Sequence, residues 1–214
     1  MAKAGEKTYF GAIGKESAYS SLNKPFIGGD TGPLFAQIGT VATLLPGGPI
    51  RLLDLGVGTG WTSLFFARMG YDVTAQDISD EAIALAKKYQ KSEYGKPVKF
   101  IASDYESMGY KNEFDCAVFF DSLHHAEDEV AALKSVYKAL KSGGKLVCRS
   151  LGRDMEVRQK LSKLLRNLVL QRRICPQRRL LRQRNKLALR ILKSIQTWDS
   201  YISHSINQVL ISHL

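Results

Sequence analysis

The strongest constraint on the fold comes from residues 52–60, which read LLDLGVGTG. Two apolar residues lead into Asp54, three glycines follow at every second position, and a helix-like run then covers residues 61–69. The glycines are Gly56, Gly58 and Gly60. Glycine adopts positive φ readily and lets a ligand lie against bare backbone, and the free amides at a helix start attract anions. The segment predicts a buried strand that turns sharply into a helix beside a ligand.

Residues 51–150 alternate between strand and helix patterns, which predicts a parallel sheet covered by helices on both faces. Ser79 is suited to cap the second of the three expected helices, and Gly143 and Gly144 to end the third. The expected strands are 51–55, 71–76, 98–102, 116–120 and 145–148, and the expected helices are 61–69, 80–90 and 128–141.

The first 50 residues precede this core. Residues 33–45 predict a helix with Pro33 in its first turn. Residues 3–32 are rich in glycine and aromatic residues. This arm could cover the mouth of the site as a lid, or it could pack on the surface without a role in binding.

Acidic residues stand at the ends of four expected strands: Asp54, Asp77, Asp104 and Asp121. In an open α/β sheet, ligands bind beyond the carboxyl ends of the strands. Four carboxylates that meet at one edge repel one another unless each has a donor to bind. The pattern therefore predicts a ligand that carries several hydrogen-bond donors.

The D-x-G-x-G-x-G run that starts at Asp54 resembles motif I of the class I, Rossmann-like S-adenosylmethionine-dependent methyltransferases. A dinucleotide fingerprint has the different spacing G-x-G-x-x-G, and an acid before the first glycine suits an ammonium group better than a pyrophosphate. A NAD dehydrogenase would also place an acid at Asp77, so the glycine spacing and Asp104 distinguish the two families. The resemblance covers about residues 51–150 and implies a doubly wound, mostly parallel sheet.

The resemblance also implies roles for the cofactor-binding residues. Asp54 orients the methionine part of S-adenosyl-L-methionine, beside the three glycines of the turn. Asp77 accepts hydrogen bonds from both ribose hydroxyls, and Ile78 packs on the adenine. Asp104 accepts a hydrogen bond from the adenine amino group, with Tyr105 beside it.

Residues 120–125, FDSLHH, correspond in the resemblance to motif IV, which faces the methyl group and the acceptor. Asp121 belongs to the cofactor side of this motif. His124 and His125 have a suitable pKa and position to deprotonate a hydroxyl acceptor, although either could instead line the pocket or bond to backbone. We expect the adjacent imidazoles to point apart and find no third ligand, so no metal site is predicted.

The composition predicts a cytoplasmic protein. The three cysteines, Cys116, Cys148 and Cys175, are odd in number and lack metal-ligand spacing, which favours reduced thiols. No signal peptide pattern and no apolar run of about 20 residues occurs, so no membrane span is predicted. The sequence leaves open the oligomeric state and whether the acceptor atom is oxygen, nitrogen or carbon.

The net charge of +11 is unevenly distributed along the chain. Residues 1–148 hold 16 Lys and Arg against 17 Asp and Glu, a net charge of −1, whereas residues 149–214 hold 15 against 3, a net charge of +12. Arginines rise from 2 to 11 across this boundary, and glycines fall from 17 to 1. Residues 157–170 and 178–195 are Leu/Arg/Lys-rich, as in basic helices, and Pro176 separates them.

Three explanations of residues 151–214 compete. The tail could be a basic helical module that binds RNA or an anionic membrane, a solvated appendage, or a frame-shifted translation. Degenerate back-translation favours the last, because a shifted frame from Arg149 can spell EPGKGHGSS, which resembles a run that some bacterial members of the family carry there. An open shifted frame in the coding DNA would support this reading.

The sequence as a whole predicts a Rossmann-like methyltransferase core that lacks its last strands and exposes the edge of its fifth strand. Three regions follow: an arm and helix in 1–50, the cofactor-binding core in 51–150, and a basic helical tail in 151–214. The expected activity is methyl transfer to a small molecule by in-line displacement. The alternatives are an RNA methyltransferase that uses its tail, and a non-catalytic protein that only binds the cofactor.

Overall fold

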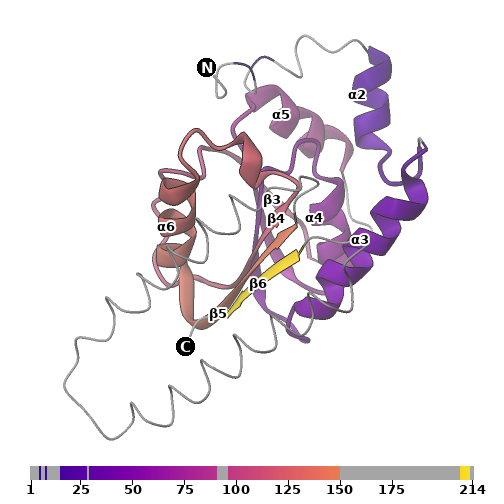
Figure 1. Ribbon diagram of the computed structural model, residues 1–214. Coiled ribbons are helices and arrows are strands. Elements are labelled where there is room, and N and C mark those ends of the chain that lie inside the picture. The colour runs from indigo at the N-terminus through magenta and orange to yellow at the C-terminus, as the bar shows by residue number, and fades with distance from the viewer. Residues whose placement is uncertain are drawn as a thin grey trace, which may run out of the picture. The chain divides into compact units, whose positions relative to one another are not determined.

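A six-stranded sheet in the order β3-β2-β1-β4-β5-β6 forms the centre of the structure (Figure 1). Strands β1 to β5 pair in parallel, and β6 pairs antiparallel with β5. The chain runs outward from β1 to β3 and then returns to β4 on the other side of β1, so the topological switch point lies between β1 and β4. The strands are β1 (Arg51–Leu55), β2 (Asp72–Asp77), β3 (Lys99–Ala102), β4 (Phe114–Phe120), β5 (Leu140–Arg149) and β6 (Gln208–Ser212).

The computed structural model describes residues 15–27, 29–90, 96–149 and 208–212, together with Gly5 and Thr8. These residues belong to one unit, and the second unit, Gly152–Asn207, lies outside them. No helix in the described ranges has the length and apolar character that a bilayer crossing requires.

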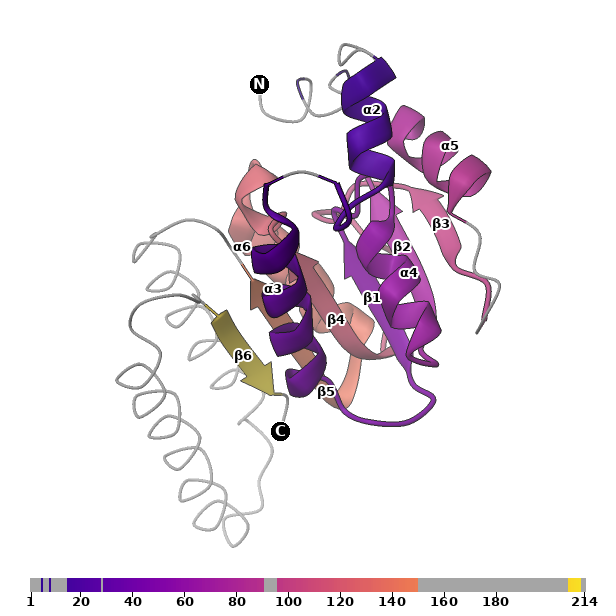
Figure 2. The same ribbon diagram turned by 90° about the vertical axis from the view of Figure 1, so that its right-hand side faces the viewer.

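Helices cover both faces of the sheet, as predicted. In Figure 1, α3 and α4 lie on one side of the strands and α6 on the other, and Figure 2 shows α3 and α4 in front of the sheet. The helical elements are α2 (Lys15–Leu22), α3 (Thr31–Leu44), α4 (Trp61–Arg68), α5 (Asp80–Tyr89), the short 3₁₀ helix η1 (Leu123–His125) and α6 (Glu129–Ala139).

The larger part of the core lies between the sheet and helices α3, α4 and α5. The parallel register places Leu52, Val73 and Val118 on this face, where they pack with Val41 of α3 and Phe66 of α4. Each of these side chains is almost fully buried, and burial of one such side chain contributes about 1.5–3 kcal/mol. This packing holds the carboxyl ends of the strands, where the expected ligand site lies.

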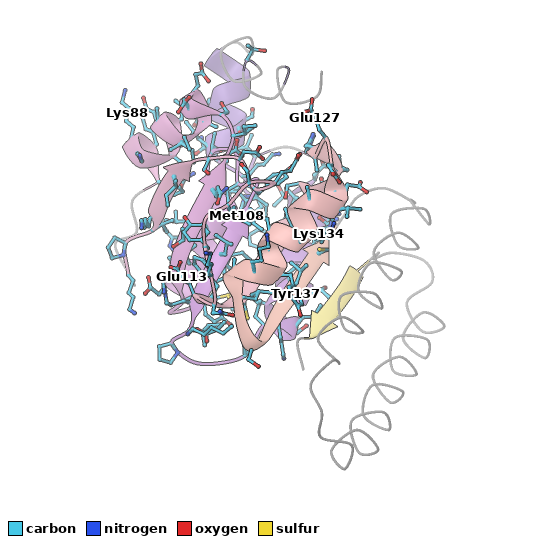
Figure 3. All side chains as sticks on the ribbon, turned by 90° about the vertical axis from the view of Figure 1, so that its left-hand side faces the viewer. Lys88, Met108, Glu113, Glu127, Lys134 and Tyr137 are labelled. Carbon is cyan, nitrogen blue, oxygen red and sulfur yellow. The ribbon has the colours of Figure 1, made fainter. Side chains whose placement is uncertain are left out.

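Helix α6 covers the opposite face (Figure 3). It buries Leu133 and Val136 and exposes Lys134 on its outer side. The loop after β3 packs beside it, where the amide of Met108 donates a hydrogen bond of 3.0 Å to the hydroxyl of Ser135.

Two details differ from the sequence-based expectation. The third expected helix ends at Ala139 rather than near residue 141, and β5 begins at Leu140. Gly143 and Gly144 lie within β5 rather than in a helix cap, at a register shift between β4 and β5. A side chain has no room at Gly144, because its Cβ would lie 2.9 Å from the carbonyl oxygen of Lys141. The glycines therefore serve an irregular strand.

The structure also contains a strand in the tail, which the sequence does not predict. β6 pairs along residues 145–149 of β5, from Lys145 opposite Ser212 to Arg149 opposite Gln208. An uncovered β5 would present unpaired amides and carbonyls, and the segment QVLIS has the β-branched and apolar residues that suit a strand. The edge beside β5 is thus occupied. The predicted helices in 157–170 and 178–195 lie outside the described ranges and stay predictions. The frameshift proposed from Arg149 onward also stays a prediction, because only Arg149 and residues 208–212 of that segment are described and their fold does not test the reading frame.

Candidate cofactor and acceptor site

The glycine run forms the sharp turn that the sequence predicts. Gly56, Gly58 and Gly60 have φ values of 68°, 53° and 83°, which favour glycine. The amide of Gly56 donates to the carbonyl of Gln76 at 2.8 Å, which joins the turn to the end of β2. Helix α4 begins directly afterwards at Trp61.

Two of these glycines are also required by the packing of the protein on itself. A Cβ at Gly56 would lie 2.4 Å from the Cβ of Ser122, and a Cβ at Gly60 would lie 2.5 Å from a ring atom of Phe100. The sequence interpretation assigned the glycines to positive φ and to ligand contact. The structure adds a further reason, which is the close approach of the turn to Ser122 after β4 and to Phe100 in β3.

Ser122 links the glycine turn to the segment that follows β4, and sequence reasoning missed it. Its hydroxyl donates a hydrogen bond of 2.6 Å to the carbonyl of Leu55, and its own carbonyl accepts one of 3.1 Å from Tyr105. The position directly after the strand-ending Asp121 is the signal that could have found it.

Asp54 is a buried carboxylate with unused hydrogen-bonding capacity. Its Oδ2 accepts hydrogen bonds from the hydroxyls of Thr62 and Ser63 in the first turn of α4, at 2.8 and 2.7 Å. Its Oδ1 has no hydrogen-bond partner within the described part of the chain, and the residue is only 1% exposed. Burial raises the pKa of Asp54 to about 6, against the smaller opposing effect of these hydrogen bonds. A cationic donor at this position would compensate the buried charge.

Asp77 ends β2 and holds two backbone amides. Its Oδ2 accepts a hydrogen bond of 2.7 Å from Gly58, and its Oδ1 accepts one of 2.9 Å from Ser79. Ser79 in turn caps α5 by accepting from the amide of Ala82, as predicted. Ile78 is half-buried between them. These two contacts fix the carboxylate at the end of β2 beside the glycine turn.

Asp104 and Tyr105 follow β3 and have different surroundings. The carboxylate of Asp104 accepts a hydrogen bond of 2.8 Å from the amide of Glu106 and is half-buried. Tyr105 is buried, and its ring meets Phe119 edge-on with centroids 5.4 Å apart. Tyr105 thus supports the loop, and its expected position beside the adenine stays a prediction.

Asp121 lies between two cationic or potentially cationic side chains. Its Oδ1 is 3.9 Å from Nδ1 of His124, and its Oδ2 is 3.6 Å from Nη1 of Arg149. Its backbone has a φ of 56°, and its amide donates a hydrogen bond of 2.7 Å to the carbonyl of Arg149. Sequence reasoning missed Arg149, although a cation at the end of the fifth strand is the corresponding signal.

His124 and His125 lie in η1, and both are exposed. Their ring centroids are 4.1 Å apart with an angle of 40° between the ring planes. The expectation that the two imidazoles point apart is therefore wrong, because the 3₁₀ turn places them side by side. No group of three possible metal ligands occurs in the ranges that the structure covers.

Helix α2 contacts the glycine turn directly. The hydroxyl of Thr59 donates a hydrogen bond of 2.9 Å to the carbonyl of Ser21, and the side-chain amide of Gln90 donates one of 3.0 Å to the carbonyl of Leu22. Part of the N-terminal arm is therefore attached to the predicted cofactor site. Its function as a lid stays a prediction.

A family profile described as a methyltransferase domain matches residues 53–148. The Bacillus subtilis (strain 168) protein YqeM, a methyltransferase by name, is 36% identical over 45% of this chain and 40% of its own length. A ubiquinone biosynthesis O-methyltransferase of Xanthomonas axonopodis pv. citri is 33% identical over 52% of this chain and 47% of its own length. The chain thus spans less than half the length of these two relatives.

Among solved structures, the PH0226 protein of Pyrococcus horikoshii has a TM-score of 0.55 at 24% identity, over 74% of this chain and 70% of that one. This likeness concerns the fold. The matching profile covers the strands and turns that carry Asp54, Asp77, Asp104 and Asp121. Residues 53–148 therefore match a methyltransferase domain, in agreement with the resemblance of this segment to the class I, Rossmann-like S-adenosylmethionine-dependent methyltransferases.

Proposed function

We propose that the protein transfers the methyl group of S-adenosyl-L-methionine to a small-molecule acceptor by in-line displacement. The observation that carries this proposal is the buried carboxylate of Asp54, whose Oδ1 has no partner in the described ranges and lies beside the glycine turn. An ammonium group, directly or through a water molecule, supplies the donor that this oxygen lacks. The donor set therefore fits the amino-acid part of the cofactor.

The remaining cofactor contacts follow from the strand ends. Asp77 would accept the ribose hydroxyls beside Ile78, and Asp104 would accept the adenine amino group beside Tyr105. Asp121 would border the methyl group. The glycine turn that holds the cofactor between these acids consists of Gly56, Gly58 and Gly60.

Bound at this site, the cofactor supplies a methyl group on a positively charged sulfur. The protein aligns the acceptor with this group and excludes water. For a hydroxyl acceptor, His124 or His125 removes the proton. The carboxylate of Asp121, 3.9 Å from Nδ1 of His124, orients that ring.

The net charge of residues 1–148 is −1, which favours a small-molecule acceptor over a nucleic acid. Nucleic-acid-binding proteins concentrate positive charge on the binding surface. The positive charge of this chain lies in residues 149–214. If RNA were the substrate, the protein should bind RNA in a salt-dependent way and lose this binding when residues 149–214 are deleted. A cytoplasmic location belongs to the same proposal and is supported by the unbonded thiols of Cys116 and Cys148.

Titration calorimetry with S-adenosyl-L-methionine and with S-adenosylhomocysteine tests cofactor binding. We expect the wild-type protein to bind both and Asp77→Ala to lose this binding. Asp72→Ala is the matched control, because Asp72 starts the same strand and pairs at the surface with Lys96 at 3.8 Å. Failure of the wild-type protein to bind either compound would contradict the proposal, as would equal binding by the two variants.

Transfer of labelled methyl to a panel of small acceptors then tests catalysis. A protein that binds the cofactor but labels none of the acceptors, including cellular metabolite extracts, would be the non-catalytic alternative. Labelling of a small molecule supports the enzyme.

A further inference from the structure

Arg149 is a buried cation at the carboxyl end of β5. Its side chain is 5% exposed, and its Nη1 has no hydrogen-bond partner in the part of the chain that the structure describes. The nearest carboxylate oxygen, Oδ2 of Asp121, is 3.6 Å from this nitrogen, which exceeds hydrogen-bond distance. A buried guanidinium N–H without an acceptor is costly, so this position favours a further oxygen ligand.

An aromatic ring lies against this guanidinium. Its central carbon lies 5.3 Å from the centroid of the Phe120 ring. Phe120 in turn meets Trp61 edge-on with centroids 5.3 Å apart, and both rings are buried. Charge interactions are strong in such surroundings because little water screens them. Burial lowers the pKa of Arg149, and Asp121 opposes this effect.

The location ties Arg149 to the acceptor rather than to the cofactor. Arg149 is opposite Phe120 in the register of β4 and β5. Phe120 directly precedes the segment from Asp121 to His125, which faces the acceptor in the proposed function. The carbonyl of Arg149 also holds the amide of Asp121 at 2.7 Å. Among the described residues, Asp121 directly after β4 is the carboxylate paired with Arg149, and His124 of η1 lies 3.9 Å from the other oxygen of the same carboxylate.

We infer that Arg149 binds the acceptor oxygen as an anion and that the acceptor is a phenol or a similarly acidic hydroxyl compound. This inference rests on the proposed function and specifies its substrate class. The planar guanidinium donates N–H groups to oxygen in a fixed geometry, and a nearby positive charge lowers the pKa of a hydroxyl. An amine acceptor would enter the site as an ammonium ion, which Arg149 repels.

The proton of the acceptor hydroxyl passes to the neutral imidazole of His124 and then to solvent. The acceptor oxygen, held by Arg149, forms a bond to the methyl carbon while the carbon–sulfur bond of the cofactor breaks. The electron pair of that bond stays on sulfur, which leaves as a neutral thioether.

4-Nitrophenol provides a test that does not depend on turnover, because its phenolate form absorbs visible light and its phenol form does not. The probe is titrated into protein saturated with S-adenosylhomocysteine, and its absorbance is followed against pH. We expect the pKa of the bound probe to fall by about one unit or more below its solution value. In Arg149→Met this shift should disappear, and probe affinity should weaken about tenfold or more.

Arg51→Met is the matched control. Arg51 stacks on Phe114 with 5.1 Å between its central carbon and the ring centroid, but at the opposite end of the strands. This variant should keep the full shift. Arg149→Lys retains the positive charge but not the planar guanidinium. The bound probe should therefore keep a lowered pKa in this variant but bind more weakly. If Arg149→Met does not fold, Arg149→Lys is compared with Arg51→Met instead.

The outcomes separate this inference from the proposed function. If S-adenosylhomocysteine does not bind, the proposed function itself fails. If it binds but the bound probe keeps its solution pKa, or if Arg149→Lys behaves like Arg51→Met in both affinity and pKa, the role of Arg149 is refuted. Preferential labelling of amines over phenols in the acceptor panel would also overturn it.

Discussion

The carboxylate of Asp77 accepts a hydrogen bond of 2.7 Å from the amide of Gly58, so the end of β2 holds the turn that follows β1. The same carboxylate accepts from Ser79 at the start of α5. Asp77 therefore organises the loop in addition to its proposed contact with ribose. Substitution at Asp77 should affect stability as well as binding.

Asp77→Ala should lower the free energy of unfolding by about 1–3 kcal/mol without any ligand, because two backbone amides lose their acceptor. Asp77→Asn retains one acceptor oxygen and should lose less. Urea denaturation of the unliganded proteins measures both. Asp72→Ala, at the exposed start of the same strand, should change stability by less than about 0.5 kcal/mol. Equal losses in all three variants would show that Asp77 does not support the turn.

The stability of the unliganded protein should depend on the protonation of Asp54. Burial raises the pKa of Asp54 from 3.8 to about 6, so the folded protein favours the protonated acid. The contribution of protonated Asp54 to the stability of the folded protein is complete below about pH 4 and is lost as pH rises through about 6. Relative to the wild-type protein, Asp54→Asn should therefore gain stability between these pH values, on the order of 3 kcal/mol. A constant difference in urea denaturation from pH 4 to 7 would contradict the raised pKa.

Cofactor affinity should show the opposite pH dependence. The ammonium group of the cofactor favours ionised Asp54, so affinity should increase as pH rises through about 6. Titration calorimetry at pH 5, 6 and 7 measures the effect. Asp54→Asn should bind weakly at every pH. A wild-type affinity that does not change over this range would indicate that Asp54 does not interact with the ammonium group.

Gly56→Ala should destabilise the protein more than Gly70→Ala does. Both glycines have positive φ, 68° and 92°, so both substitutions introduce backbone strain of about 1–2 kcal/mol. A Cβ at Gly70 meets open space, whereas a Cβ at Gly56 would lie 2.4 Å from Cβ of Ser122. Thermal and urea denaturation should show an additional loss of about 1–3 kcal/mol for Gly56→Ala. Similar losses would mean that the loop moves away from Ser122 at little cost.

Replacement of the motif IV histidines should slow catalysis rather than weaken cofactor binding. If His124 is the base, His124→Ala should lower turnover of a hydroxyl acceptor about 10²–10⁴-fold. His125→Ala should have the smaller effect, because the proximity to Asp121 involves His124. Cofactor affinity, measured by calorimetry, should stay unchanged in both. Unchanged turnover in both variants would make the two side chains part of the pocket wall.

Thr59→Val should loosen helix α2. Valine preserves the shape of this buried side chain but cannot donate the hydrogen bond of 2.9 Å to the carbonyl of Ser21. Hydrogen exchange should therefore become faster in α2 (Lys15–Leu22) and stay unchanged in β1 and β4. Thr43→Val is the control, because the hydroxyl of Thr43 bonds only locally, to the carbonyl of Thr40. If α2 also acts as a lid, cofactor dissociation should be faster in Thr59→Val; unchanged α2 exchange would refute the attachment itself.

The order of strands and helices in the core could be predicted from the sequence. Strand β1 has the predicted bounds, and the other core elements except β5 differ by about one or two residues at their ends. Hydrophobic periodicity, the cap at Ser79 and the glycine turn are local signals, and each acts within a few residues of the chain. The placement of Asp54, Asp77 and Asp104 at the carboxyl ends of strands follows from the same signals.

The contacts that give the site its chemistry join residues far apart in the chain. Local patterns do not contain the pairing of Arg149 with Asp121, the approach of Gly56 to Ser122 or the contact of Thr59 with Ser21. The same is true of β6, which forms because the edge of β5 offers unpaired backbone groups. The sequence determined the type of fold because local periodicity and turn chemistry act along the chain. Packing of the sheet and helices determined which side chains meet, because those distances exist only in the folded protein.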